Sequence, residues 1–333
     1  MIRSDTRELH ERALIVDLHC DVLLTTTLLR WNWAKRHRPN PFWTAPLMGH
    51  VDIPRLKDGN VGCMALGIVT NPLAGRRGPV KIDRMLDRMH RKLDEHADEL
   101  ELATTAQAIR GARERGRIAC FGGLEGAHGL VGSLGRLPHY RERGLRYVGF
   151  SHFSKNEACA PMVGWGQDPA APLSDYGRDL VDECNRLQLV IDVAHVNRAG
   201  VFEICERTKH PVICSHTGCS ALFGGPRNLD DEQLRAIADT GGVIGVIFVS
   251  PFIGPGGIQA VVNHLTHIRD TVGPEHTAIG SDWEGFNLFS RDLDGPDKLP
   301  LLTQALLDRS WSDDEVLGAL GHNFLRVLAE VAG

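Results

Sequence analysis

The sequence alternates between two kinds of segment almost from its start to its end. Short apolar runs rich in Val, Ile and Gly are followed by longer stretches with the apolar spacing of amphipathic helices. Eight runs predict strands: residues 14–17, 61–69, 118–124, 145–151, 189–193, 212–215, 243–249 and 277–281. Helices are predicted over residues 82–100, 176–187, 259–271, 299–308 and 313–331, with another that opens at residue 230. Several of the runs are apolar on both faces, as is typical of parallel strands buried from both sides.

Eight strands that alternate with helices predict an α/β fold, a single (β/α)8 TIM barrel with an inserted loop after its first strand. An open doubly wound sheet is the alternative, but it usually has fewer strands. The sequence also contains neither G-x-G-x-x-G after a strand nor G-x-x-x-x-G-K-[ST]. A length of 333 residues suggests about two domains, whereas a barrel of this size forms one unit. We therefore expect one domain over residues 1–333.

The inserted loop is the one irregular segment. Residues 25–49 contain Trp31, Trp33, Phe42 and Trp43 together with several Pro. In a barrel, an insertion after the first strand lies beside the face where active sites form. It can be a lid or substrate wall, or an aromatic plug over the barrel end, and the sequence leaves both interpretations open.

Charge and cysteine content indicate which classes of binding partner and which cellular compartment to expect. The net charge is -5, from 37 Lys and Arg against 42 Asp and Glu, so no basic excess favours nucleic acid. The 8 cysteines form no C-x-x-C pair and lie mostly in apolar runs, which predicts buried free thiols in a reducing, cytoplasmic setting. No apolar run reaches the roughly 18 residues that span a bilayer, and the N-terminus lacks a signal-peptide core, so no membrane partner is expected.

The ends of the predicted strands carry residues that can do chemistry. Active sites of barrels lie at the C-terminal ends of the strands. Six of the eight runs are followed there by a group that can bind a metal or move a proton: His19 with Asp21, Glu125, His152, His195, His216 and Asp282. A single histidine is more often a structural residue, but the convergence of six strand ends on one face favours a functional site.

This set of side chains suits a pair of divalent ions. Imidazole together with carboxylate suits Zn²⁺, with Mn²⁺, Co²⁺ or Fe²⁺ as alternatives. His19 and Asp21 are the first and third residues of an extended segment, so both point to one side and can reach one ion. Glu125 is the candidate bridge, and His195 and His216 would then hold the second ion. Two ions about 3.5–4 Å apart share a water and lower its pKa, which gives a hydroxide nucleophile at neutral pH.

Three more residues complete the predicted site. Asp282 can take a proton from the attacking water and pass it to a leaving amine, with a helix N-cap as the structural alternative. His152 can stabilise the oxyanion on the attacked carbonyl, with a core histidine as the alternative. Arg227 follows the sixth predicted strand on a Gly- and Pro-rich loop and suits bidentate carboxylate binding, with a surface arginine as the alternative.

With these residues, the chain resembles the membrane dipeptidase family (renal dipeptidase, peptidase family M19) of amidohydrolase-like barrels. Eight segments carry the resemblance in chain order: residues 16–21, 51–56, 123–126, 191–196, 211–216, 227–228, 279–282 and 323–327. The resemblance implies a zinc-dependent dipeptidase with two Zn²⁺ per chain. His19 and Asp21 would bind the first ion, Glu125 would bridge, and His195 and His216 would bind the second.

The resemblance also assigns His152 to the substrate carbonyl, Arg227 to the substrate's C-terminal carboxylate and Asp282 to acid/base catalysis. It implies a free dipeptide as substrate, in some cases with a D-residue at the C-terminal position, and a homodimer. Two departures stand out. Cys20 lies between the first two ligands where the family often has Asn, and residues 248–251 offer no Tyr to help hold the substrate carboxylate.

We therefore predict hydrolysis of the peptide bond of free dipeptides. A related binuclear amidohydrolase that acts on N-acyl amino acids or lactams is the first alternative, favoured by the missing Tyr and the unusual first loop. A non-catalytic barrel that binds a peptide or a protein partner is the second. Retention of all five predicted ligands together with Asp282 argues against it, because binding alone needs no activated water.

Overall fold

The computed structural model describes residues 2–28, 31–37, 49–70, 72–285, 288–290 and 292–333. Eight parallel strands form a closed ring in the order β2-β1-β9-β8-β7-β6-β5-β4, which the pairing of β2 with β4 completes. The strands are β1 (Ile15–Cys20), β2 (Val61–Val69), β4 (Ile118–Glu125), β5 (Leu145–Gly149), β6 (Val190–Asp192), β7 (Val212–Thr217), β8 (Val243–Val246) and β9 (Thr277–Ile279). The predicted (β/α)8 barrel is confirmed.

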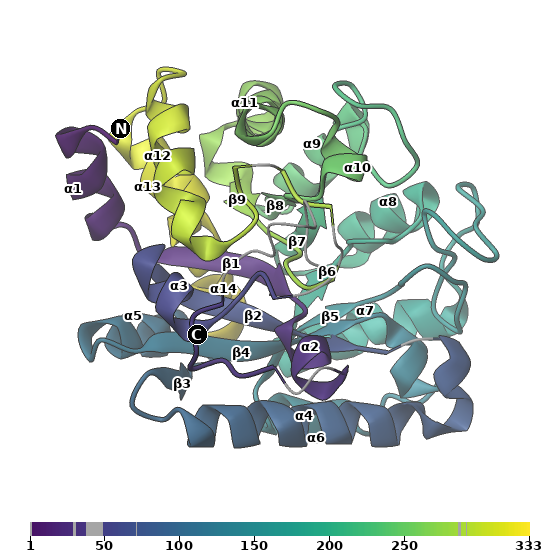
Figure 1. Ribbon diagram of the computed structural model, residues 1–333. Coiled ribbons are helices and arrows are strands. Elements are labelled where there is room, and N and C mark those ends of the chain that lie inside the picture. The colour runs from purple at the N-terminus through teal and green to yellow at the C-terminus, as the bar shows by residue number, and fades with distance from the viewer. Residues whose placement is uncertain (1, 29–30, 38–48, 71, 286–287, 291) are drawn as a thin grey trace.

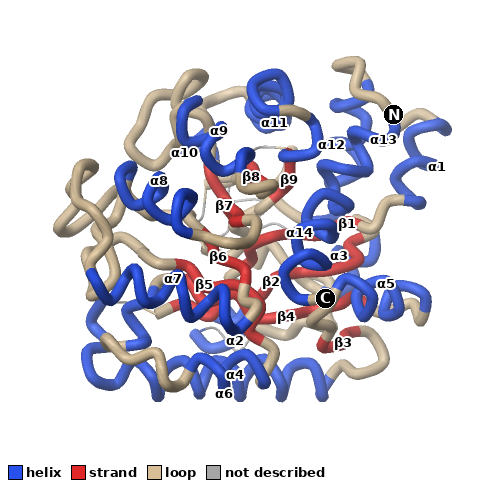
Figure 2. The backbone as a smooth tube through the Cα atoms, turned by 180° about the vertical axis from the view of Figure 1, so that it is seen from behind, coloured by secondary structure: helices blue, strands red, loops and turns tan. Residues whose placement is uncertain are grey.

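Helices surround the barrel on its outside (Figures 1 and 2). They are α1 (Ser4–Arg12), α2 (Val22–Leu28), α3 (Ile53–Asp58), α4 (Gly78–Glu95), α5 (Ala106–Glu114), α6 (Leu137–Glu142), α7 (Asp175–Leu187), α8 (Arg198–Arg207), α9 (Asp231–Asp239), α10 (Ser250–Ile253), α11 (Ile258–Val272), α12 (Leu299–Leu307), α13 (Asp313–Leu317) and α14 (Asn323–Ala332). Each long helix buries one apolar stripe, as Met85, Leu86 and Met89 of α4 show. No described helix is long and apolar enough to cross a membrane.

The interior of the barrel is filled with apolar side chains below the strand ends. Val16 and Leu18 of β1 point inward and are buried with Phe121 of β4. Phe324 of α14 stacks on Phe121 at 5.8 Å, and Tyr147 of β5 meets the same ring edge-on at 6.3 Å. This packed interior supports the site from below, because such a barrel is a solid core and not a pore.

The structure corrects several predicted boundaries. The helix predicted over 82–100 ends at Glu95, and a short strand that the sequence did not predict follows, β3 (Leu100–Leu102). β3 pairs with the first half of β4 alone, where β5 has not yet joined the sheet. The strands predicted over 145–151 and 243–249 end early, at Gly149 and Val246, because their last residues leave the sheet for loops.

The helix predicted over 313–331 contains a π-helical turn, Gly318–His322, between α13 and α14. All eight cysteines lie in the described residues and are free. Seven are buried and Cys205 is half-buried, so the prediction of free thiols in apolar surroundings is confirmed.

Candidate active site

The structure brings the predicted site residues together at the C-terminal ends of the strands. Three of them are in strands: His19 in β1, Glu125 at the end of β4 and His216 in β7. The other five lie in loops that follow strands: Asp21, His152, His195, Arg227 and Asp282. All are buried except His152, whose side chain is 18% exposed. Eight side chains far apart in the chain therefore converge on one end of the barrel.

A cavity of about 160 Å³ opens onto this cluster. Six of the predicted residues line it, namely Asp21, Glu125, His152, His195, Arg227 and Asp282. Its remaining walls are mainly apolar, formed by Leu24, Val69, Phe153 and Phe252. A small molecule in this cavity would therefore contact both the polar cluster and an apolar wall.

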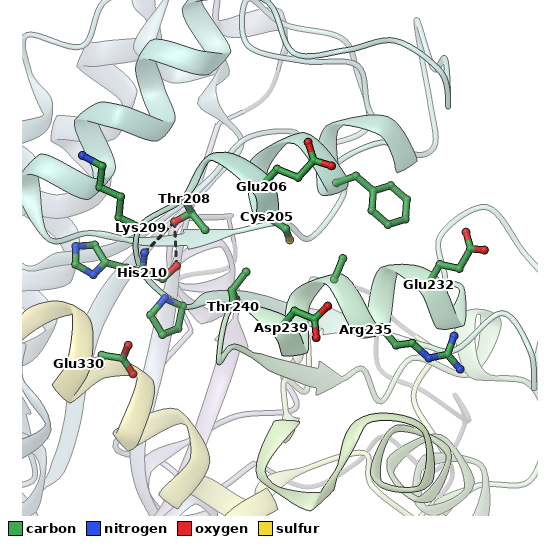
Figure 3. Close-up of a pocket in the computed structure, with 13 residues that line it drawn as sticks. Cys205, Glu206, Thr208, Lys209, His210, Glu232, Arg235, Asp239, Thr240 and Glu330 are labelled. Atoms are coloured by element: carbon green, nitrogen blue, oxygen red, sulfur yellow. Dashed lines mark hydrogen bonds between the residues drawn. The ribbon is translucent and has the colours of Figure 1, made fainter.

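A larger hollow of about 580 Å³ lies between α8 and α9, around Cys205 and His210 (Figure 3). It opens beside the start of β7, at the end of the barrel opposite the C-terminal ends of the strands. The described groups of three or more residues that could hold a metal ion all belong to the site cluster and none to this hollow. The candidate functional cavity is therefore identified by its metal-binding side chains and not by its volume.

Three unpaired groups define a first candidate metal position. His19 Nε2 lies 3.4 Å from Asp21 Oδ1 and 3.6 Å from Glu125 Oε2. Each of these three atoms is buried and has no hydrogen-bond partner within the described part of the chain. Buried polar atoms are almost always bonded, so two carboxylate oxygens and a ring nitrogen left in this state fit a divalent cation.

The second candidate position shares Glu125. His195 Nε2 and His216 Nε2 lie 3.1 Å and 3.6 Å from Glu125 Oε1, and 3.0 Å from each other. Oε2 of Glu125 faces the first position and Oε1 the second, which is the arrangement that the predicted bridge requires. The imidazole and carboxylate donors present at both positions fit divalent ions of the zinc type.

Electrostatics favour a cation at the second position and at its bridging carboxylate. At the first position burial alone would lower the pKa of His19, but Tyr147, Glu125 and Asp21 outweigh it and raise that pKa well above the usual value, so a cation there must displace a proton. Burial, with a contribution from Arg227, lowers the pKa of His195 and His216 well below the usual value, so both rings are neutral. Burial alone would raise the pKa of Glu125, but His152 and His19 outweigh it and hold that pKa well below the usual range. Neutral imidazole and ionised carboxylate are the forms that bind metal ions.

Asp282 is held in a strained backbone conformation beside the first position. Its φ of 60° is unusual for a residue other than glycine, and its N–H donates to His19 O at 3.0 Å. A Cβ on Gly285 would lie 2.3 Å from Asp282 Oδ1 and 2.8 Å from Asp21 Oδ2, so any other residue there would displace these two carboxylates. No helix begins in residues 283–285, and the carboxylate instead lies with His19 and His216.

Burial raises the pKa of Asp282 well above the usual value, and the nearby Asp21 and Glu125 add to the effect. A carboxyl group in this setting readily takes up a proton. That property suits the proton transfer assigned to it from the sequence.

Arg227 is a buried cation without an acidic partner. Only 3% of it is exposed, which excludes the surface alternative. Its Nη2 donates to His216 O at 2.8 Å and lies 3.2 Å from His195 Nε2. In the described part of the chain its hydrogen-bond partners include no carboxylate, and its Nε has no partner. A buried guanidinium that lines the cavity in this state suits an incoming carboxylate.

His152 stands above Glu125 at the mouth of the cavity. Its Nε2 lies 3.7 Å from Glu125 Oε1, and its ring meets that of His195 edge-on at 4.8 Å. Its partial exposure leaves it open to a molecule in the cavity.

Sequence reasoning missed a layer of residues behind the ligands. Asp17 and Asp192 are buried strand residues that bind Ser281 and Ser215, and Tyr147 contacts His19. A charged residue inside an apolar strand was the available signal for the two aspartates. No local pattern marked the tyrosine.

The described residues include part of the aromatic insertion. Trp31 Nε1 donates to Val51 O at 2.9 Å, and Trp33 is buried. Phe42 and Trp43 lie outside the described residues, so the choice between lid and plug stays a prediction. Residues 248–251 carry no Tyr, and the aromatic side chain that this region contributes to the cavity is Phe252, whose ring centroid is 6.0 Å from the Arg227 guanidinium.

Comparisons of the whole chain with known proteins point to one family. The model of the membrane dipeptidase family, peptidase family M19, matches residues 3–333. The dipeptidase verJ of Clonostachys rogersoniana is 30% identical over 297 residues, which cover 85% of this chain and 76% of that protein.

Two solved structures share the fold. One is a metallopeptidase from Rhodobacter sphaeroides in complex with a phosphinate mimic of the dipeptide L-Ala-D-Ala. It has a TM-score of 0.86 and 21% identity, and the match covers 96% of this chain and 99% of that one. The other is the probable dipeptidase PvdM from Pseudomonas aeruginosa, with a TM-score of 0.86, 20% identity and coverage of 98% and 97%. The chain therefore belongs to the membrane dipeptidase family, peptidase family M19, and is an enzyme of the metallo-dipeptidase class.

Proposed function

We propose that the enzyme uses two divalent ions, Zn²⁺ foremost, to hydrolyse free dipeptides, including those with a D-residue at the C-terminal position. The observation that carries this proposal is a single cavity with unpaired metal-binding atoms on its floor and, in its wall, a buried guanidinium that has no carboxylate partner among the described residues. A free dipeptide is the small molecule that presents a peptide carbonyl and a free carboxylate close together. The dipeptide mimic bound to the Rhodobacter sphaeroides relative supports this substrate class.

The two candidate positions assign the metal ligands. His19, Asp21 and Glu125 would hold one ion, and Glu125, His195 and His216 the other. Ions bound there supply Lewis acidity, which polarises a carbonyl and lowers the pKa of a water.

The side chains of the protein bind and orient the substrate. Arg227 would bind the C-terminal carboxylate and so fix the peptide bond over Glu125. His152, at the cavity mouth, would donate a hydrogen bond to the carbonyl oxygen as negative charge develops on it. Asp282 would accept a proton from the attacking water and deliver it to the leaving amine. The apolar wall would receive the dipeptide side chains and exclude water.

A second candidate function is hydrolysis of N-acyl amino acids or lactams. Phe252 carries no hydroxyl group to assist Arg227, and an N-acyl amino acid offers the same carboxylate without a free amine. The same cavity and the same ions would serve both reactions.

A substrate series separates these functions and tests Arg227. We expect free dipeptides to be cleaved with kcat/KM about 10²–10³-fold above that of their C-terminal amides, because only the carboxylate pairs with the buried guanidinium. Arg227→Met should abolish that preference by lowering the rate on free dipeptides alone. Arg235→Met, which changes an exposed arginine in the hollow of Figure 3, is the matched control and should leave the preference unchanged.

Equal cleavage of free dipeptides and their amides would contradict the role of Arg227. Cleavage of N-acetylated amino acids in preference to free dipeptides would support the second candidate function instead.

A further inference from the structure

The ring of His19 is fixed from behind by a tyrosine. Its Nδ1 lies 2.8 Å from the hydroxyl of Tyr147, and that hydroxyl lies 3.1 Å from Leu18 O. The carbonyl can only accept, so the single hydroxyl proton of Tyr147 is directed to it. Towards His19 the hydroxyl oxygen is then an acceptor, and Nδ1 carries the ring proton. Nε2 is then the ring nitrogen that faces the carboxylates of Asp21 and Glu125 and is left for a cation.

The ring of His216 is held by Ser215 and Asp192, which also direct its ring proton to Nδ1. Ser215 Oγ donates to Asp192 Oδ2 at 2.6 Å, and the same oxygen lies 2.8 Å from His216 Nδ1. Because the hydroxyl proton goes to the aspartate, Ser215 accepts from Nδ1–H. His216 Nε2 therefore presents its lone pair to Glu125 and His195.

The aspartate itself is anchored in one orientation. Asp192 Oδ1 accepts from the backbone N–H groups of Ser215 at 2.9 Å and Ala194 at 3.0 Å. Asp192, Ser215 and His216 are all buried. The carboxylate is thus an acceptor on both oxygens, and the direction of the hydrogen bonds from His216 to Ser215 to Asp192 follows from it.

We infer that Tyr147 and the Asp192–Ser215 pair are positioning residues that hold His19 and His216, respectively, in the tautomer with Nδ1 protonated and Nε2 free to bind a cation. This inference rests on the proposed function for its purpose, since the fixed lone pairs serve the two candidate metal positions. Hydrogen bonds of this kind behind a ligand typically change metal affinity by about 10–100-fold.

The chain contains its own control for this arrangement. Asp17 and Ser281 repeat the pattern between β1 and the loop after β9: Ser281 Oγ donates to Asp17 Oδ2 at 2.6 Å, and its N–H donates to Oδ1 at 2.8 Å. Both residues are buried. However, the other hydrogen-bond partners of Ser281 Oγ in the described part of the chain are backbone groups, the carbonyl of His19 at 3.3 Å and the N–H of Trp283 at 3.1 Å, and not a histidine ring. Loss of its hydroxyl removes the same kind of pair without changing a tautomer.

Asp192→Asn is the most informative variant. An asparagine of the same shape can keep its carbonyl oxygen on the two backbone N–H groups and place its amide N–H₂ towards Ser215. The hydroxyl proton of Ser215 then turns to His216 Nδ1, which moves the ring proton to Nε2. The packing and the number of hydrogen bonds are kept, but the lone pair that would bind the ion is lost.

The experiment uses the full-length protein freed of metal. Long-range ¹H–¹⁵N NMR spectra of ¹⁵N-histidine-labelled protein identify the tautomer of each ring, with His216→Gln used to assign the signal. We expect His216 protonated on Nδ1 in the unmodified protein and on Nε2 in Asp192→Asn. Titration with Zn²⁺ against a chromophoric chelator should show one of two sites weakened about 10–100-fold in Asp192→Asn, Ser215→Ala and Tyr147→Phe. Ser281→Ala should retain both affinities within about threefold, since it contacts no ring.

Unchanged tautomers in Asp192→Asn, or unchanged zinc affinity in all three variants, would overturn the inference. Failure of the unmodified protein to bind zinc would instead contradict the proposed function, while the NMR measurement would still decide the tautomers. The two ideas therefore fail in distinguishable ways.

Discussion

Glu125→Gln is expected to lower kcat/KM for a free dipeptide by on the order of 10³-fold or more, because metal ions contribute several kcal/mol to such reactions. One oxygen of Glu125 faces each candidate metal position, and both lie within 3.6 Å of ring nitrogens. Glutamine keeps the shape of the side chain but replaces one oxygen by an N–H₂ group, which cannot bind a cation, and removes the charge. Zinc bound per chain should fall from two ions to one or none.

The matched control is Glu157→Gln, which makes the same change at an exposed glutamate in the loop after β5. It should retain both ions and full activity. A Glu125→Gln protein that kept two ions and most of its activity would contradict the bridging role.

Asp282→Asn is expected to lower kcat by about 10²–10⁴-fold, the usual contribution of a positioned acid or base. A base must be deprotonated to act, so its activity is lost as the pH falls through its pKa. Burial, together with Asp21 and Glu125, raises the pKa of Asp282. We therefore expect kcat to fall on the acidic side of its pH profile at a pH above the usual pKa range of an aspartate. The residual activity of Asp282→Asn should not show this fall at acidic pH. A pH profile of kcat for both proteins measures the difference.

The zinc content of Asp282→Asn distinguishes two roles for this residue. Its carboxylate lies with His19 and His216 in a group that could itself hold an ion. If the variant keeps two ions and loses only kcat, Asp282 acts in proton transfer. Loss of an ion in parallel with activity would show that it is a ligand and would contradict the acid/base assignment.

The sequence predicts the barrel and the place of its site because both follow from a local pattern. Apolar runs define the strands, and in a closed parallel sheet all strand ends meet at one face. His19, Glu125 and His216 could therefore be placed together before any coordinates were known. β3 escaped prediction because three residues are too few to show a period.

The layer behind the ligands could not be predicted because it depends on closure of the barrel. Tyr147 reaches His19 from 128 residues away, and Ser281 reaches Asp17 from 264 residues away. Such contacts leave no periodic trace in the sequence. Phe252 was missed for a related reason: the chain leaves β8 at Val246 and turns into α10, which carries this ring over Arg227.

The most direct test of the central claim combines metal removal with a single substrate. Protein is stripped with a chelator, dialysed and titrated with Zn²⁺ while release of free alanine from L-Ala-D-Ala and the zinc bound per chain are followed together. We predict that the stripped protein has only background activity and that hydrolysis returns as two ions bind per chain. Hydrolysis at the original rate without metal, or no hydrolysis of any free dipeptide by protein carrying two zinc ions, would contradict the proposed metal-dependent dipeptidase activity.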